Sequence, residues 1–185
     1  LKKYGGDLAI GAFGIVNRLV FIVVMIVMGL NQGMQPIAGY NFGAKLYGRV
    51  NKVLRLTIIY ATAVTTFGFL VGMLVPDLVV GIFTSDAELT ELSVTGLRIT
   101  VMFFPIIGFQ MVTSNFFQSI GMAGKAIFLS LTRQMLILLP CLLILPQFFG
   151  VAGVWYSMPV SDLLASLIAL VMLVCQFRKF RTSPL

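Results

Sequence analysis

Long apolar stretches, each long enough to cross a lipid bilayer, constrain this chain more than any other feature. Five such segments lie at about residues 8–40, 54–83, 92–121, 126–147 and 151–177. A membrane-spanning helix needs about 20 mostly apolar residues, and these runs lack the apolar–polar alternation of membrane barrel strands. Because only helices and closed barrels satisfy every backbone polar group in lipid, we predict an all-α, polytopic membrane bundle of five transmembrane helices.

The scarcity of charge excludes several classes of function. Only 10% of the 185 residues are charged, whereas a soluble domain carries about 25%. The net charge of +7 is spread in short runs between the apolar segments, which argues against a nucleic-acid partner. The chain has no His, no pair of acids deep inside the segments and no phosphate-binding glycine loop. We therefore expect no enzyme activity, no metal site and no bound cofactor.

The positions of the charges predict an orientation in the membrane. The basic residues flank alternate junctions and the end of the chain: Lys45, Arg49, Lys52, Arg55, Lys125, Arg178, Lys179 and Arg181. Acids gather between the second and third segments: Asp77, Asp86, Glu88 and Glu91. The positive-inside rule then puts the basic junctions and the C-terminus in the cytoplasm of a cell that carries the protein in its inner membrane. Residues 45–55 are also amphipathic, and we expect them to form an interfacial basic helix.

Three charged residues lie deep inside the predicted spans, where each needs a partner or a function: Arg18, Arg133 and Asp162. At ~1.5 Å per residue, Asp162 lies roughly 18 Å from the outer end of its segment and Arg133 roughly 11 Å from the inner end. In a core of ~30 Å these depths nearly coincide. We predict that Arg133 and Asp162 approach each other, with Arg18 as a competitor for the acid. A structural ion pair and a coupling site at Asp162 both remain open.

Uncharged polar residues form a stripe on the third segment. Gln110, Thr113, Ser114, Phe117 and Gln118 follow the spacing of one helix face. Such residues either hold helices together or line a wet cavity. Prolines 105, 140 and 159 lie inside spans and predict kinks.

Several short motifs occur in a familiar order. They are Gln-Pro-Ile-Ala-Gly-Tyr-Asn-Phe-Gly-Ala-Lys at 35–45, Phe-Phe-Gln-Ser-Ile-Gly at 116–121, Leu-Ser-Leu-Thr-Arg-Gln at 129–134, Gly-Val-Ala-Gly-Val-Trp at 150–155 and Pro-Val-Ser-Asp at 159–162. As a set they resemble the C-terminal lobe of multidrug and toxic compound extrusion (MATE) family transporters. The resemblance covers nearly the whole chain.

The resemblance implies a twelve-helix transporter with two lobes, of which residues 1–185 would hold helices 8–12, a partial C-terminal transport lobe. Helix 7 and the N-terminal lobe would be missing partners in the same protein. Such proteins export small organic compounds, often cationic and amphipathic, in exchange for protons or sodium, by alternating access between the lobes. The odd number of spans agrees with a fragment. Some members bind a cation through an acid on the helix matching 92–121, and here Gln110 is present without an acid, so any coupling acid is expected in the other lobe.

On this basis the expected contacts in a substrate cleft are Asn17, Gln35, Gln110, Thr113, Ser114 and Phe117. Arg18, Arg133 and Asp162 are expected to be structural charges within the membrane. Two alternatives remain open. A lipid or lipid-linked oligosaccharide flippase of related architecture should have a strongly basic central cavity, for which only Arg18 could serve. A membrane scaffold without transport should have no wet cleft.

Overall fold

The computed structural model describes the backbone of residues 2–182 and the side chains of residues 6–178. The side chains of Lys179 and Arg181, part of the predicted basic tail, lie outside the described residues. The helices in order are α1 (Lys2–Gly43), α2 (Tyr47–Leu74), α3 (Pro76–Gly81), α4 (Ala87–Val101), α5 (Phe104–Ser119), α6 (Ala123–Leu131), the π-helical η1 (Thr132–Leu138), α7 (Leu139–Phe149) and α8 (Val151–Thr182).

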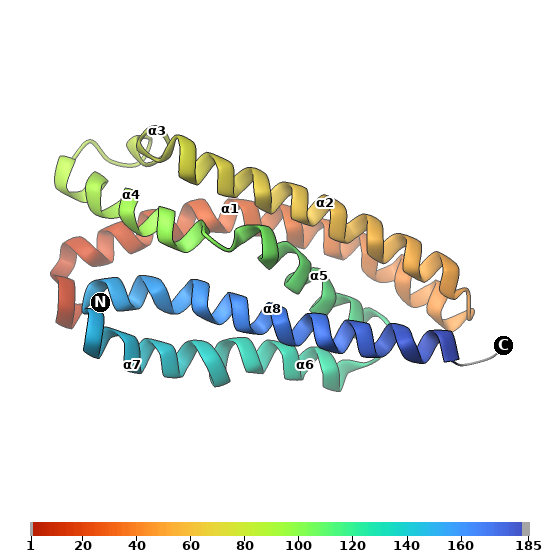
Figure 1. The fold of residues 1–185 in the computed structure, drawn as a ribbon. Helices are drawn as coiled ribbons and strands as arrows, with labels where there is room; N and C mark the ends of the chain where they lie inside the picture. The colour runs from red at the N-terminus through yellow and green to blue at the C-terminus, as the bar shows by residue number, and fades with distance from the viewer. Residues whose placement is uncertain (1, 183–185) are drawn as a thin grey trace.

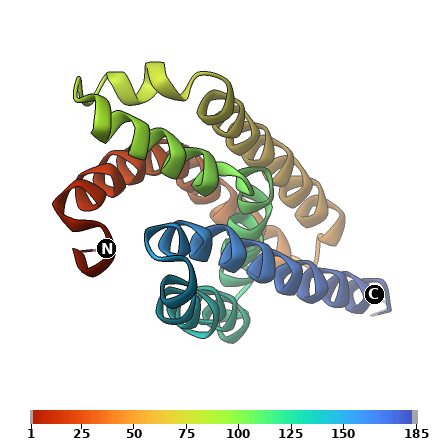
Figure 2. The same ribbon diagram turned by 60° about the vertical axis from the view of Figure 1, so that its left-hand side comes forward.

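These helices form an elongated bundle whose long members run nearly along one axis (Figure 1). Helices α1 and α2 pack along each other, α7 packs against α8, and α4 and α5 lie between the two pairs (Figures 1 and 2). Four helical stretches are long and apolar enough to span a membrane, and α4 with α5 adds a fifth span that is bent by 54°. The predicted all-α membrane bundle is therefore confirmed.

Prolines decide where the predicted spans are interrupted. The third span breaks between α4 and α5, and Pro105 lies in the first turn of α5, where its missing N–H costs no helical hydrogen bond. The second span ends at Leu74 rather than at residue 83, because Val75 precedes Pro76 and leaves the helical region (φ −133°, ψ 45°). Pro159 lies within α8, which continues as one helix on both sides of it.

The basic stretch expected as an interfacial helix at residues 45–55 is helical from Tyr47 onward and is continuous with the second span. Helix α2 begins at Tyr47 and continues without a break to Leu74. No Gly or Pro lies between residues 49 and 67, so nothing interrupts the backbone hydrogen bonds after the basic stretch. Residues 47–55 are the first turns of a long spanning helix.

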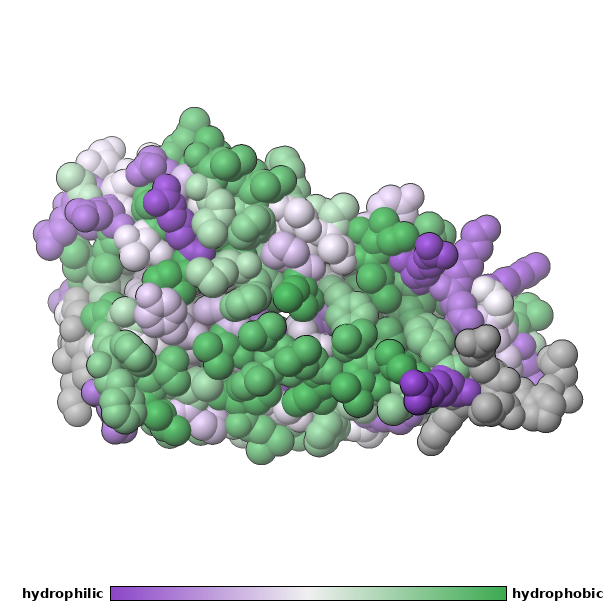
Figure 3. Space-filling view, viewed as in Figure 1, coloured by the Kyte–Doolittle hydropathy of each residue, from purple (hydrophilic) through white to green (hydrophobic). Residues whose placement is uncertain are grey.

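The surface of the bundle divides into an apolar belt and two hydrophilic ends. Large apolar side chains face outward along the helices, among them Met25 (58% exposed) and Phe67 (68% exposed). Figure 3 shows apolar residues over the length of the bundle, with hydrophilic residues mainly at its ends. The α1–α2 turn, the α5–α6 turn and the last turns of α8 lie at one end (Figure 1). The described basic residues of the predicted junctions thus share one end, and the acids around α3 and the start of α4 lie at the other.

Small residues let the helices approach closely inside the bundle. A Cβ atom at Gly108 of α5 would lie 2.8 Å from the carbonyl oxygen of Ala61 and from Thr65 Oγ1, both on α2. A Cβ atom at Gly96 of α4 would lie 2.6 Å from the ring of Trp155 on α8. Packing through small residues is the usual means of association in lipid, where the hydrophobic effect between helices is absent.

Candidate functional site

The predicted ion pair between α8 and the η1 segment is present. Arg133 Nε and Nη2 each lie 2.8 Å from Oδ1 of Asp162. The carboxylate side chain is 7% exposed, and the guanidinium side chain is 32% exposed. The prediction that these residues approach each other is confirmed. The pair joins two helices at a depth where an isolated charge would be costly.

A π-helical segment presents Arg133. In η1 the backbone pattern widens, and the N–H of Leu139 bonds to the carbonyl oxygen of Gln134, five residues earlier. Pro140 follows directly in the first turn of α7. It lacks an N–H and would collide with the carbonyl four residues before it in a regular helix. The widened turn accommodates this proline, and short π segments of this kind are frequent at functional sites.

Two adjoining hollows beside Arg133 form what we call the polar groove. Their volumes are about 110 and 420 Å³, and both are lined by Ser114, Asn115 and Ser130. The polar side chains around the groove come from α5, α6 and η1: Gln110, Ser114, Asn115, Gln118, Ser130, Arg133 and Gln134. Among the residues that line these two hollows, Arg133 is the one with a charged side chain. The groove therefore combines hydrogen-bonding groups with one cation in the middle of an apolar bundle.

The predicted stripe on α5 divides between the groove and the core. Gln110 and Ser114 line the groove, although Gln110 is only 4% exposed. Thr113 is fully buried and donates a hydrogen bond to the carbonyl oxygen of Phe109, at 2.9 Å. Phe117 is also fully buried, and Nζ of Lys125 lies 5.2 Å from the centre of its ring. In this structure Thr113 and Phe117 pack inside the lobe and do not line a cleft, because the stripe is wide enough to face two neighbours.

The remaining candidates from α1 lie apart from the groove or contact it indirectly. Nε2 of Gln35 donates a hydrogen bond to Oδ1 of Asn115, at 3.1 Å, so it ties α1 to a residue of the groove. Asn17 is exposed on α1. Arg18 is exposed as well, and the described acid predicted as its partner, Asp162, is paired with Arg133 instead. The expected competition for Asp162 is not seen.

Five polar residues of the groove were not among the predicted contacts. Gln118 was placed only in the stripe and Arg133 only among the structural charges, while Asn115, Ser130 and Gln134 were not singled out at all. Ser130, Arg133 and Gln134 follow the three- and four-residue spacing of a helix face, and this signal could have identified the second wall. Asn115 lies beside the predicted stripe in sequence, and its contact with Gln35 comes from a residue 80 positions away. Sequence spacing within one helix carries no information about such a contact.

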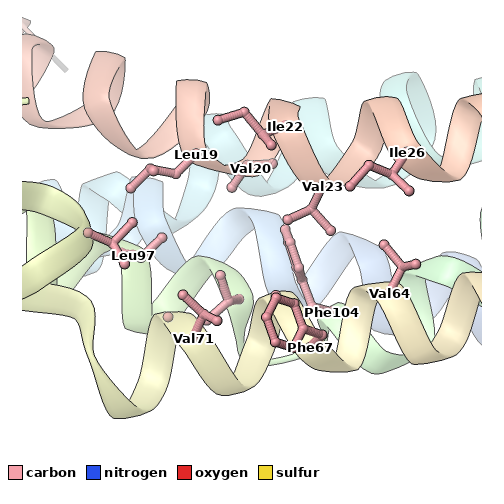
Figure 4. Close-up of a pocket in the computed structure, with 14 residues that line it drawn as sticks. Leu19, Val20, Ile22, Val23, Ile26, Val64, Phe67, Val71, Leu97 and Phe104 are labelled. Carbon is pink, nitrogen blue, oxygen red and sulfur yellow. The ribbon is translucent and has the colours of Figure 1, made fainter. Parts of the chain in front are cut away.

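A third hollow, separate from the two that form the polar groove, has an apolar lining. It encloses about 240 Å³ between α1 and α2, and Figure 4 shows side chains of Val23, Phe67 and Phe104 around it. Its lining consists of aliphatic and aromatic residues and glycine. Such a hollow offers no directional group for recognition, so we take the polar groove as the candidate site.

Comparisons with known proteins agree on one family. The family model described as MatE matches residues 1–144. Multidrug export protein MepA of Staphylococcus aureus strain MSSA476 is 28% identical over 165 residues, which are 89% of this chain and 36% of the relative. MepA of Staphylococcus saprophyticus is 24% identical over the same shares. The chain spans about a third of the length of these curated relatives.

Solved structures agree with this result. The MATE multidrug transporter DinF-BH, solved in complex with R6G, matches with a TM-score of 0.86 and 37% identity, over 99% of this chain and 41% of that chain. An outward-facing multidrug resistance MATE family transporter of the MOP superfamily matches with a TM-score of 0.90 and 19% identity, over 98% of this chain and 41% of that chain. An inward-facing one matches with a TM-score of 0.87 and 18% identity, over 99% of this chain and 43% of that chain. The fold, the motif order and the family match thus give one result: the chain belongs to the MatE family, the multidrug and toxic compound extrusion transporters that its motifs resemble.

Proposed function

We propose that these helices form part of a secondary antiporter that exports small organic compounds from the cell in exchange for protons or sodium. The observation that carries the proposal is a polar groove with a membrane-embedded Arg133, in a chain that belongs to a transporter family. In lipid, polar side chains around a hollow are costly unless water, substrate or another helix contacts them. A second lobe across this groove would complete a substrate cleft.

The likeness to both outward-facing and inward-facing neighbours supports a lobe that moves as a rigid body. The same arrangement of helices matches the two structures with similar TM-scores, 0.90 and 0.87. Alternating access requires each lobe to keep its internal packing while the cleft opens to one side and then the other. The bent α4–α5 span and the ion pair at Asp162 would then belong to the fixed interior of the lobe.

Two rival functions predict different sites. A flippase for lipid-linked oligosaccharides calls for several cations in a central cavity, whereas the groove contains Arg133 alone and Arg18 is exposed on α1. A scaffold without transport calls for polar residues that are all satisfied between helices. Asn115 fits that description, since its amide bonds to Gln35 and to the carbonyl oxygen of Met111. Ser130 is exposed and lines the groove instead, which favours a wet cleft.

Transport by the complete polypeptide in proteoliposomes tests the proposal. Efflux of an organic dye should depend on an imposed proton or sodium gradient and should stop when that gradient is collapsed. Absence of dye movement under every gradient would contradict the proposed function.

Solvent access separates the cleft from a buried scaffold. Single cysteines at Ser114 and Ser130, which line the groove, should react with a membrane-impermeant thiol reagent, and a substrate should slow the reaction. A cysteine at Thr113, which directly precedes Ser114 and is fully buried, serves as the matched control and should stay unreactive. Equal lack of reaction at all three positions would support the scaffold.

Labelling from each side tests the orientation. We propose that the end with Lys52 and Lys125 faces the cytoplasm, since basic residues favour that side. A cysteine at Lys52 should be protected from an impermeant reagent in intact cells, and a cysteine at Glu88 should be labelled. The reverse pattern would invert the assignment.

A further inference from the structure

We propose that the apolar hollow between α1 and α2 is a binding site for one membrane phospholipid with an anionic head group. In this site an acyl chain fills the hollow, and the lipid phosphate contacts Arg18 at its rim. The inference goes beyond the proposed transport, because it is independent of the exported compound and of the coupling ion. It stands on the opening of the hollow, the chemistry of its lining and the height of Arg18 in the membrane.

The apolar hollow opens at the surface of the bundle. Ile22 and Ile26 of α1 and Phe67 of α2 line it, and each of these side chains is more than half exposed. Leu97 of α4 and Phe104 of α5 also line it and are buried, so they form its floor. Figure 4 shows α1 and α2 as the two walls. The hollow is therefore a groove between two spanning helices, which a hydrocarbon chain can enter from the membrane.

The lining selects hydrocarbon over water. It consists of aliphatic and aromatic side chains and the two glycines Gly68 and Gly72. A buried water needs roughly two to four polar partners, and this lining offers no polar side chain. A hollow left empty would forfeit the dispersion contacts of the atoms around it. In a membrane the filler at hand is an acyl chain, because lipid tails surround the spanning helices.

A close contact between α1 and α2 fixes the height of Arg18. A Cβ atom at Gly68 of α2 would lie 2.9 Å from Cγ2 of Val23 on α1, so these two residues are level. The two helices are consecutive and run in opposite directions (Figure 1). A step from Val23 back to Arg18 on α1 therefore corresponds to an equal step from Gly68 forward to Met73 on α2. Arg18 is level with the end of α2, which lies at Leu74.

The end of α2 lies at the boundary of the hydrocarbon core. From Arg55 to Leu74 the helix runs for about 20 residues, or about 30 Å, which is the thickness of a typical core. Arg55 at one end and Asp77 just beyond the other mark the limits of this apolar stretch. Arg18 thus lies at the height of the lipid head groups, at the acidic end of the bundle. This register places it nearer to the head groups than its position in the apolar segment alone predicts.

Arg18 lies at the rim of the hollow and keeps its charge available. It adjoins Leu19 and precedes Ile22 by one helical turn, and both of these residues line the hollow. Its side chain is exposed, and within the part of the chain that the structure describes it forms no ion pair, including with Asp77. A guanidinium can bind a phosphate through two parallel N–H bonds. Arg18 therefore supplies the directional contact that the hollow itself lacks.

The single cation at the rim favours an anionic lipid over a zwitterionic one. In phosphatidylcholine the ammonium group of the lipid compensates its phosphate, whereas phosphatidylglycerol carries a net negative charge. The attraction of one basic residue to an anionic membrane surface corresponds to a roughly fivefold preference. We expect a preference of this size for phosphatidylglycerol in the hollow.

Site-specific photo-crosslinking of the complete transporter tests the proposal. The protein is placed in nanodiscs with equal amounts of phosphatidylglycerol and phosphatidylcholine, and p-benzoylphenylalanine replaces Phe67, which lines the hollow. Phe148 of α7 is the matched control, because it is also exposed and lies at the acidic end of the bundle but does not line the hollow. Mass spectrometry of the crosslinked lipid should show roughly fivefold enrichment of phosphatidylglycerol at position 67 and no enrichment at position 148.

Two substitutions separate the head-group contact from the place of the acyl chain. Arg18→Gln should abolish the enrichment at position 67. Arg55→Gln is its control, since it removes an exposed charge at the other end of α2 and should leave the enrichment unchanged. Val71→Phe, which fills part of the hollow, should reduce the enrichment although Arg18 is still present. An unaltered crosslinking pattern at position 148 checks that this variant is folded.

Three results would overturn the inference. The first is equal crosslinking of the two lipids at position 67 of the wild-type protein, or an enrichment that persists in R18Q. The second is an enrichment that survives V71F, because the hollow would then not hold the acyl chain. The third is crosslinking from position 67 to protein alone, which would show that another part of the polypeptide covers the hollow.

Discussion

The apolar hollow between α1 and α2 and the polar groove beside η1 are separated by one helix, α5. Phe104, at the start of α5, faces the apolar hollow, and Gln110 and Ser114, further along, face the groove. The apolar hollow is shaped only by packing, whereas the groove is held by an ion pair and by the bond between Gln35 and Asn115. Substitutions in the first region should therefore not change recognition of the exported compound, and substitutions in the second should change it.

The largest effect is expected where the groove holds a buried charge. Replacing Arg133 with Ala leaves the carboxylate of Asp162 unpaired inside the bundle and should cost about 3–5 kcal/mol of folding free energy. Thermal unfolding of the purified complete transporter in detergent measures this loss. The variant R133Q/D162N is the control and should recover most of the stability. If R133A unfolds at the wild-type temperature, the ion pair is not a determinant of the lobe.

The next effect concerns the close contact between Gly108 of α5 and Ala61 of α2. Substituting Val at Gly108 places side-chain atoms against the backbone of Ala61 and should cost about 1–3 kcal/mol through overpacking. The same change at Gly33, where a Cβ atom meets nothing within 4 Å, is the matched control. Unfolding temperatures of the two variants should differ clearly. Equal temperatures would show that α2 and α5 can separate without cost.

A smaller effect should come from the bond between α1 and the groove. Leucine at Gln35 removes the hydrogen bond to Asn115. Hydrogen bonds between membrane helices contribute about 0.6 kcal/mol on average and at most about 1.7 kcal/mol. The expected change in unfolding temperature is therefore slight, while binding of a transported organic dye should weaken because Asn115 lines the groove. Unchanged binding would show that the hydrogen bond from Gln35 of α1 does not affect binding in the groove.

The smallest effect is expected in the apolar hollow. Leucine at Val71 adds one methylene to a hollow of about 240 Å³ and should change stability by less than about 1 kcal/mol. Its matched partner is leucine at Ser130, which removes a hydroxyl from the groove. Binding of the same organic dye should be unaffected by V71L and weakened by S130L. A loss of binding in V71L would show that the apolar hollow also contributes to recognition.

Several features of this lobe followed from the sequence. Apolar length predicted the spans, since lipid forces helical hydrogen bonding on any such segment. Depth along two consecutive helices predicted that Arg133 would meet Asp162, because a short turn between them fixes their relative height. The proline at 105 marked the break between α4 and α5 through a purely local effect on the backbone.

Other features were missed because they depend on which neighbour a helix face meets. Thr113 and Phe117 share a stripe with Gln110, yet they pack into the core while Gln110 borders the groove. A helix of mixed polarity presents its faces to several partners, and the stripe alone does not say which side is open. Lys125, on a different helix, covers the ring of Phe117.

By itself, then, the sequence determined that lipid surrounds most of this chain, how many spans it has, and that Arg133 pairs with Asp162. These features depend on local hydrogen bonding and on helix rise. The tertiary structure decided which polar residues face open volume. That choice is set by contacts between residues far apart in the chain, such as Gln35 with Asn115. Such contacts leave no periodic signal in any single helix.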